Sequence, residues 1–270
     1  MLLSRLAHDR KGTGEPLVLI HGIGHRRQAW DPIVNQLAKK YDVISVDLAG
    51  FGESPAYPKS VPYDMDTACE NLTENFAVWG IERPHLVGNS LGGAIALELG
   101  ARGLASSVTA LSPAGFFGRI DRFQAFFLLF VLRVSSLLPD RLLHAFSRAA
   151  IGRRLIGSVL YVHPERFTAD EAYGDALALK HASAFERTIK AGVTYKFDRP
   201  VQVPTTVAWG TKDRILPYGQ SATAQERLPA ARHVALPHCG HVPMIDDPEL
   251  IIRVIDQTIA QARQGLHQTP

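Results

Sequence analysis

The sequence predicts an α/β fold in which helices flank a mostly parallel sheet. Short apolar, β-branched runs alternate with helical patterns along the 270 residues, and the apolar runs are continuous rather than alternating. Continuous apolarity is typical of strands covered on both faces, as in a parallel sheet between two layers of helices. A chain of this length can bury one large core, so we expect a single α/β domain with an insertion.

The predicted elements follow one another in a regular order. The residues up to Gly14 indicate an antiparallel edge strand and a turn. Apolar runs predict the other strands at 16–22, 41–50, 85–90, 106–115, 205–213 and 232–241. Helical patterns lie between them, near 28–40, 65–80, 91–102, 217–228 and 247–264.

The alternation stops between residues 116 and 200, which read as several helices. One is predicted over 140–161 from an approximate apolar stripe, and another begins at Thr168, with Glu171 as its capping-box partner. The run 125–132 is apolar on every side but far shorter than the roughly 20 residues that span a bilayer. It is a buried helix, a pocket wall or a surface that touches lipid. We therefore expect a core of 1–115 and 201–270 and a helical insertion at 116–200.

Charge and cysteine content exclude some classes of protein. The 29 basic and 26 acidic residues give a net charge of +3, too small to indicate a nucleic-acid partner. Eight arginines and three acids give residues 116–166 a charge of +5. Two interpretations fit this charge equally well. The arginines are solvated on the surface of amphipathic helices, or they attract an anionic lipid surface or an anionic group of the substrate. The two cysteines form no disulfide framework and the first residues lack a signal-peptide core, so we expect a cytoplasmic protein without a transmembrane segment.

The stretch 85–99, HLVGNSLGGAIALEL, starts as a buried strand and ends as a helix, with Ser90 at the join. A sharp turn strains the backbone of its central residue. It also brings the residues two positions before and two positions after so close together that a Cβ on either would clash, which explains Gly88 and Gly92. Such a turn projects the serine hydroxyl beyond the sheet, in front of the helix. Ser90 is therefore the candidate nucleophile.

A serine hydroxyl needs a base, and the base needs a carboxylate that orients it. Asp213 follows one late strand in WGTKD, and His241 follows the next in HCGH. The order Ser90, Asp213, His241 is the one used by nucleophile-elbow enzymes. Asp47 and Asp246 are the rival acids.

The motifs G88-N-S-L-G92, HG at 21–22, DLAGFGES at 47–54 and GH at 240–241 resemble the α/β-hydrolase superfamily, in its serine esterase and lipase branch. The resemblance covers 16–115 and 201–265. It implies an α/β-hydrolase fold with a helical cap inserted after the sixth strand, a catalytic triad of Ser90, Asp213 and His241, and no cofactor. The elbow is also similar to that of meta-cleavage-product C–C hydrolases.

The resemblance further implies that the backbone N–H groups of Ile23 and Leu91 form the oxyanion hole. His21 is expected to brace the loop before Ile23 rather than to transfer protons. No cluster of further ligands accompanies His238, Cys239 and His241, so no metal site is predicted. The predicted substrate-binding residues are Gly22, Trp30, Phe51, Asn89, Phe126, Phe127, Phe130 and Val242.

The preferred function is hydrolysis of a small-molecule carboxylic ester with an apolar acyl group through an acyl-enzyme. The alternative is a C–C bond hydrolase acting on a ring-cleavage dienone, although Val242 stands where those enzymes commonly have tryptophan. A cofactor-free perhydrolase and a non-catalytic ligand-binding member are further alternatives. Peripheral membrane contact through the cap also remains open.

Overall fold

The structure, a computed structural model, describes residues 3–266. These residues contain one seven-stranded sheet with the order β1-β3-β2-β4-β5-β6-β7. The edge strand β1 is antiparallel to β3, and every other neighbouring pair is parallel. The strands are β1 (His8–Lys11), β2 (Glu15–Ile20), β3 (Tyr41–Val46), β4 (His85–Asn89), β5 (Ser107–Leu111), β6 (Thr205–Gly210) and β7 (Arg232–Leu236).

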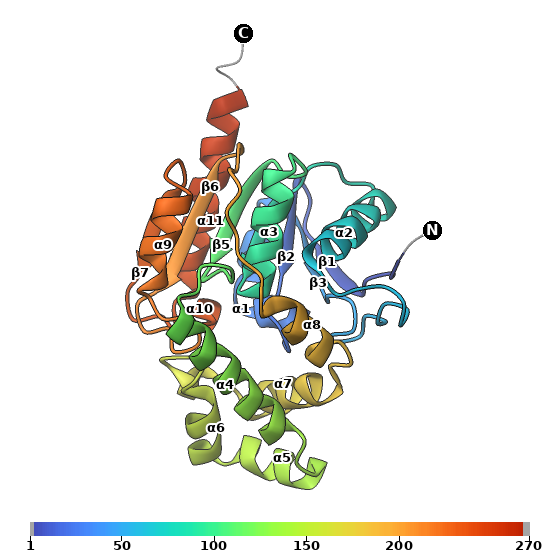
Figure 1. The fold of residues 1–270 in the computed structure, drawn as a ribbon, viewed down its shortest axis with the longest axis vertical. Coiled ribbons are helices and arrows are strands. Elements are labelled where there is room, and N and C mark those ends of the chain that lie inside the picture. The colour runs from blue at the N-terminus through green and yellow to red at the C-terminus, as the bar shows by residue number, and fades with distance from the viewer. Residues whose placement is uncertain (1–2, 267–270) are drawn as a thin grey trace.

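Helices cover both faces of the sheet (Figure 1). Val18 of β2 belongs to the apolar cluster beneath α2 and α3, whereas the next residue, Leu19, belongs to the cluster beneath α1 and α11. Neighbouring side chains of a buried strand thus enter two different cores, which explains the continuous apolar runs of the sequence. The core helices are η1 (Arg27–Trp30), α1 (Asp31–Leu37), α2 (Met65–Trp79), α3 (Leu91–Ala101), α9 (Gln220–Arg227), α10 (Pro243–Asp246) and α11 (Pro248–Leu266).

The direction of the strand order reverses at β2, which has β3 on one side and β4 on the other. Ligands of open α/β sheets bind at such a switch point, outside the carboxyl ends of the strands. The loop after β2 and the turn after β4 both lie there. Each of these strands from β2 to β7 ends one to five residues before the end of its apolar run, and the last residues of the run belong to the loop or turn that follows the strand.

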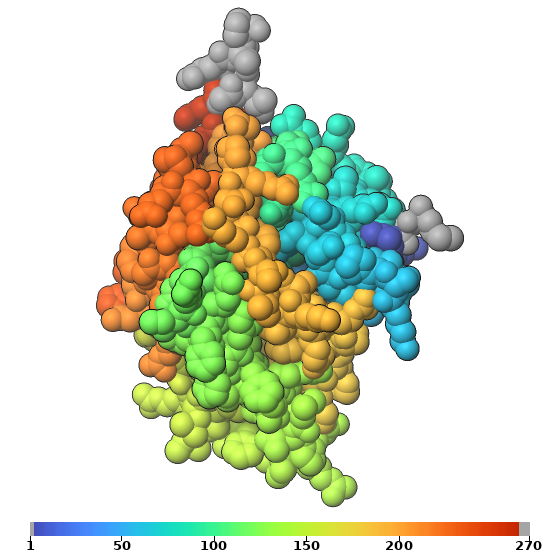
Figure 2. Space-filling model, viewed as in Figure 1, coloured from blue at the N-terminus to red at the C-terminus, as the bar shows by residue number. Residues whose placement is uncertain are grey.

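The helices between β5 and β6 form a separate layer at the lower end of the molecule in Figures 1 and 2, which we call the cap. We predicted this insertion after the sixth strand, but only five strands precede it among the described residues. The segment before β1 adds no strand, because the N–H groups of Ser4 and Leu6 donate to the side chains of Asn71 and Asn75 of α2. The cap elements are α4 (Arg119–Ser136), α5 (Asp140–Arg148), α6 (Ala150–Gly157), η2 (Pro164–Arg166), α7 (Ala169–His181) and α8 (Phe185–Gly192).

The single helix predicted over 140–161 is wrong, because the chain breaks at Ala149 into α5 and α6. Ala149 is extended, with φ −74° and ψ 121°. The Arg153 guanidinium donates to the carbonyl groups of Ser147 and Arg148, which end α5. A Cβ at Gly152 would lie 2.3 Å from the Phe146 carbonyl oxygen, so glycine permits the tight corner.

Another prediction for the cap is confirmed. Thr168 and Glu171 form the expected capping box at the start of α7. Within residues 3–266, no helix combines the length and the apolarity that crossing a bilayer requires.

Candidate active site

Ser90 occupies the turn between β4 and α3 in a strained conformation, with φ 56° and ψ −115°. A Cβ added to Gly88 would lie 2.0 Å from the Gly92 carbonyl oxygen, and one added to Gly92 would lie 2.1 Å from the Ile20 carbonyl oxygen. Both distances are far below any real contact, so these positions require glycine. The Ser90 N–H donates to the Leu111 carbonyl of β5 at 3.0 Å. The turn therefore contacts both strands that neighbour β4: Gly92 packs against the end of β2, and Ser90 is hydrogen-bonded to the end of β5.

His241 and Asp213 meet at the carboxyl ends of β7 and β6. His241 Nδ1 donates to Asp213 Oδ2 at 2.8 Å, and both side chains are buried. The other carboxylate oxygen, Asp213 Oδ1, accepts the N–H groups of Ile215 and Leu216 at 2.9 and 2.8 Å. Because a carboxylate only accepts, this arrangement keeps the Nδ1 proton in place and leaves Nε2 of neutral His241 as an acceptor.

The rival acids have other partners. Both oxygens of Asp47 bond to Arg27, and Glu53 N–H also donates to Asp47. Asp246 accepts N–H groups of Gly240 and of residues 162 and 163. Of the three candidate acids, Asp213 is the one hydrogen-bonded to His241.

The backbone around His241 is fixed by the elbow and by the cap. Asn89 Nδ2 donates to the His241 carbonyl oxygen at 2.8 Å, so the residue before Ser90 is tied to the histidine loop. The Leu160 carbonyl of the cap accepts the N–H groups of His241 and Val242 at 2.8 and 3.2 Å. A Cβ at Gly240 would lie 2.6 Å from this Leu160 oxygen, which explains the glycine of the GH motif.

Two backbone N–H groups near Ser90 are available to a ligand. Across residues 3–266, neither Ile23 N–H nor Leu91 N–H donates a hydrogen bond. Leu91 is the first residue of α3, so its N–H has no acceptor within the helix and lies at the positive end of the helix dipole. Gly22 lies beside the elbow, because a Cβ there would be 3.2 Å from Ser90 Cβ.

His21 braces the loop that carries Ile23. Its Nδ1 donates to the Gly22 carbonyl at 2.6 Å, and its Nε2 accepts the Leu48 N–H at 3.0 Å. Complete burial lowers the pKa of His21 to about 4, against the opposing influence of Asp47. His21 is therefore neutral at pH 7 with a fixed tautomer, which suits a structural role.

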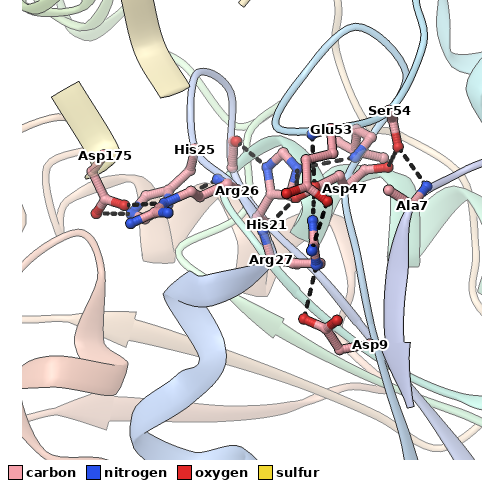
Figure 3. Close-up of polar contacts among 12 residues, drawn as sticks. Ala7, Asp9, His21, His25, Arg26, Arg27, Asp47, Glu53, Ser54 and Asp175 are labelled. Atoms are coloured by element: carbon pink, nitrogen blue, oxygen red, sulfur yellow. Dashed lines mark hydrogen bonds and ion pairs between the residues drawn. The ribbon is translucent and has the colours of Figure 1, made fainter. Parts of the chain in front are cut away.

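Two residues further along this loop, His25 and Arg26, connect the core with the cap (Figure 3). Arg26 Nε donates to Asp175 Oδ1 of α7 at 2.7 Å, and His25 Nε2 lies 3.5 Å from Asp175 Oδ2. Arg27 forms ion pairs with Asp47, Asp9 and Glu53 on the core side. Burial lowers the pKa of Arg27, but the hydrogen bonds to the neighbouring carboxylates together outweigh it and raise the pKa above its ordinary value, so these pairs are charged.

A cavity of about 130 Å³ lies between the elbow and the cap. Ser90 and His241 line it, together with the predicted binding residues Gly22, Asn89 and Val242. Most of the remaining wall is apolar and comes from the cap. The main apolar cap residues of the wall are Leu129, Leu132, Leu138, Leu143, Phe146, Ile156, Leu160, Leu179 and Phe185.

Two predicted pocket residues lie elsewhere. Trp30 is fully buried in the core beneath α1. Phe51 packs edge-on against His21 at 5.9 Å between ring centroids and borders a second cavity instead. Both are large apolar residues next to site loops, and the sequence does not distinguish packing beneath a loop from lining a pocket.

The three predicted binding residues of α4 are also absent from the wall of the catalytic cavity. Phe127 and Phe130 are 55% and 63% exposed, and Phe126 stacks on Phe117 with ring centroids 6.2 Å apart. The helix turns Leu129 and Leu132 to the cavity instead. Their three-residue spacing was the available signal, but in a run apolar on every side it does not stand out.

The sequence profile of the Alpha/beta hydrolase family matches residues 17–254. The chain belongs to the alpha/beta hydrolase family. This hydrolase is 29% identical over 275 residues to a pimeloyl-[acyl-carrier protein] methyl ester esterase of Aeromonas hydrophila, a match covering 93% of this chain and 98% of the relative. It is 26% identical over 256 residues to 2-hydroxy-6-oxo-6-(2'-aminophenyl)hexa-2,4-dienoic acid hydrolase of Metapseudomonas resinovorans, covering 88% and 81%.

A solved structure, an esterase from Thermogutta terrifontis, superposes on the hydrolase with a TM-score of 0.70 and 22% identity, over 96% of this chain and 94% of the esterase. At this identity the likeness shows the fold alone. The relatives include hydrolases named for a methyl ester and for a dienoic acid, so the family establishes a hydrolase but not the bond it cleaves. In the described part of the chain, no group of three or more His, Cys, Asp or Glu side chains is placed to hold a metal ion.

Proposed function

We propose that the protein hydrolyses carboxylic esters, with Ser90 as nucleophile, His241 as general base and Asp213 as the residue that orients His241. The observation that carries the proposal is the 2.8 Å bond from His241 Nδ1 to Asp213 Oδ2, beside a cavity that Ser90 and His241 both line. The bond leaves His241 Nε2 free to accept the Ser90 proton.

In the proposed reaction, Ser90 Oγ attacks the ester carbonyl carbon while His241 Nε2 takes the hydroxyl proton. The N–H groups of Ile23 and Leu91 stabilise the oxyanion, and neither must first break another hydrogen bond. His241 then gives the proton to the departing alcohol, which leaves an acyl-enzyme on Ser90. A water molecule, deprotonated by His241, releases the acid and restores the serine.

The cavity wall supports an apolar acyl group. Leu129, Leu132 and Leu179 present hydrocarbon to the space above Ser90. Each methylene that leaves water for such a wall contributes about 0.8 kcal/mol, or about fourfold in kcat/KM, until the cavity is full. We therefore expect activity on straight-chain nitrophenyl esters to rise from acetate towards medium chains.

A fluorophosphonate probe tests the nucleophile directly. The probe should label the native protein on the peptide that contains Ser90, identified by mass spectrometry, and Ser90→Ala should lose both labelling and esterase activity. Ser112→Ala is the matched control, because Ser112 is also buried with a positive φ, at 42°, but follows β5. Labelling at another serine, or none in folded protein, would reject the proposal, as would activity retained by Ser90→Ala.

One observation favours the second candidate, hydrolysis of a C–C bond in an anionic dienone. Arg153 lines the cavity, and its Nε is buried without a hydrogen-bond partner in the described residues. Its Nη1 donates to carbonyl groups and not to a carboxylate. A partly buried cation without a counter-ion would be stabilised by a substrate carboxylate, such as that of a dienoic acid.

Parallel assays separate the two functions. If the enzyme is an esterase, neutral nitrophenyl esters should turn over well and a ring-cleavage dienone poorly. If it is a C–C hydrolase, the dienone should be preferred and Arg153→Met should raise its KM at least tenfold. Arg154→Met provides the matched control, because the neighbouring Arg154 is exposed and does not line the cavity.

A further inference from the structure

Helix α4 has a second apolar stripe on the side away from the cavity. Its members recur every three or four residues, as one face of a helix requires, and their side chains are 48% to 82% exposed. Figure 2 shows α4 in green on the front of the cap, open to solvent. This outer stripe consists of Ile120, Phe123, Phe127, Phe130, Val134 and Leu137.

The outer stripe is not needed for packing. The opposite face of α4 already supplies the core contacts, with Ala125, Leu132 and Ser136 buried. Phe123 and Phe127 stack on each other, with ring centroids 6.3 Å apart, and within residues 3–266 neither ring stacks on a further aromatic ring. Contiguous exposed apolar side chains of this size mark an interaction surface.

Further apolar side chains surround the mouth of the catalytic cavity. Phe146 of α5 and Ile156 of α6 line the cavity and yet are 46% and 43% exposed, so they stand at its opening. Leu142, Ile151 and Leu155 on the same two helices are also exposed. The cavity therefore opens through an apolar rim at the end of the cap.

The charge of these helices indicates the partner. Residues 140–157 contain four arginines and one aspartate, a net charge of +3. Arg119, Arg141, Arg148 and Arg154 are exposed, and none forms an ion pair within residues 3–266. The one aspartate, Asp140, is paired with Lys180 at 2.7 Å. The surface thus combines apolar side chains with uncompensated positive charge.

We propose that this cap surface, the outer stripe of α4 together with the exposed residues of α5 and α6, docks on an anionic lipid membrane. Apolar side chains enter the boundary between headgroups and acyl chains, and arginines bind the lipid phosphates. A second copy of the chain is disfavoured as the partner, because a two-fold contact would place this positively charged surface against the same surface of the other copy. The cavity mouth would then face the lipid. Docking itself needs no catalysis and does not depend on the proposed esterase activity.

Co-sedimentation of the full chain with vesicles tests the proposal. Vesicles of phosphatidylcholine with 30 mol% phosphatidylglycerol (about a third of the lipid) should bind the protein, and pure phosphatidylcholine should bind it far less. The triple variant Arg141→Gln, Arg148→Gln, Arg154→Gln should weaken binding about 100-fold, the effect of removing three charges near such a surface. Phe127→Ser with Phe130→Ser should weaken it at least about tenfold, since two buried rings are lost.

Matched changes on the core serve as controls. Val78→Ser removes an exposed apolar side chain from α2, and Arg5→Gln, Lys59→Gln and Arg253→Gln together remove three exposed charges from the core. Neither control should change vesicle binding, and Ser90→Ala should bind like the native protein whether or not Ser90 proves to be the nucleophile. Equal binding to both vesicle types, no binding, or equal losses in cap and core variants would overturn the proposal. Dimerisation without lipid that Phe127→Ser with Phe130→Ser abolishes would assign the surface to a second copy instead.

Discussion

Gly88 and Gly92 make Ser90 recognisable in the sequence, because the need for glycine arises within a few residues of the turn. The partnership of Asp213 and His241 was expected from their order along the chain and from family resemblance. The backbone of His241 is held by Asn89 and Leu160, which lie far from it in sequence. No local pattern signals such contacts.

At the residue scale, Asp213→Asn should lower kcat about 10⁴-fold, because the amide no longer selects the Nδ1 tautomer of His241 or stabilises its charged form. Kinetics on a nitrophenyl ester provide the measurement. Thermal unfolding is the control, and the melting temperature should show that the variant folds. Near-normal turnover in folded Asp213→Asn would show that another group orients His241.

His21 should contribute to the pH dependence of stability. Its folded pKa of about 4 lies below the ordinary value of 6.5, so between these values the unfolded chain binds more protons. The contribution is complete above pH 6.5 and is lost as the pH falls towards 4, by about 2 kcal/mol between pH 7 and pH 5. Urea unfolding at both pH values should show a smaller decrease for His21→Asn than for the native chain. Identical decreases in the two proteins would contradict a neutral, buried His21.

At the scale of elements, α4 shows why an apolar run can be predicted as a helix without its contacts being predicted. Both faces of the helix are apolar, and only the packing of the cap decides that Leu129 and Leu132 face the cavity while Phe127 and Phe130 face outwards. The break between α5 and α6 was missed for a related reason. It depends on Arg153 and Gly152 meeting the end of α5, not on a proline or a strong turn motif.

The two faces of α4 should affect substrate preference differently. Leu129→Ala with Leu132→Ala should flatten the rise in kcat/KM from nitrophenyl acetate to medium-chain esters, because the acyl chain loses its apolar wall. Phe127→Ala with Phe130→Ala is the matched control on the same helix and should leave the profile of these soluble substrates unchanged. The reverse result would place the acyl group on the other face of α4.

At the scale of the whole molecule, the sheet and the cap differ in how they are stabilised. Every residue of β4 and β5 is buried, whereas α7 has no fully buried residue and is held to the core loop by Asp175. The alternation of buried strands and helices along the chain was predictable, because strands covered on both faces leave continuous apolar runs in the sequence. The contacts that join the layers were not, because ion pairs such as that of Arg26 with Asp175 leave no periodic signal.

Hydrogen exchange followed by mass spectrometry should resolve this difference, with amides of α7 exchanging faster than those of β4 and β5. Asp175→Asn should speed exchange in α7 further without affecting β4, because it weakens the ion pair with Arg26 and the contact with His25. Asp170→Asn changes an exposed aspartate on the same helix and should have a much smaller effect. Uniform exchange in cap and sheet would show that the two layers open together.

The carbonyl group of Leu160 has a consequence for protein engineering. It belongs to the cap, yet it accepts the N–H groups of both His241 and Val242. A chimera that exchanges this cap for that of another hydrolase would change substrate preference and at the same time release the loop bearing the histidine. Grafted caps should therefore retain the segment from Gly157 to Tyr161. This short segment, and not the helices around it, is the practical boundary between the parts of the chain that can be exchanged and those that cannot.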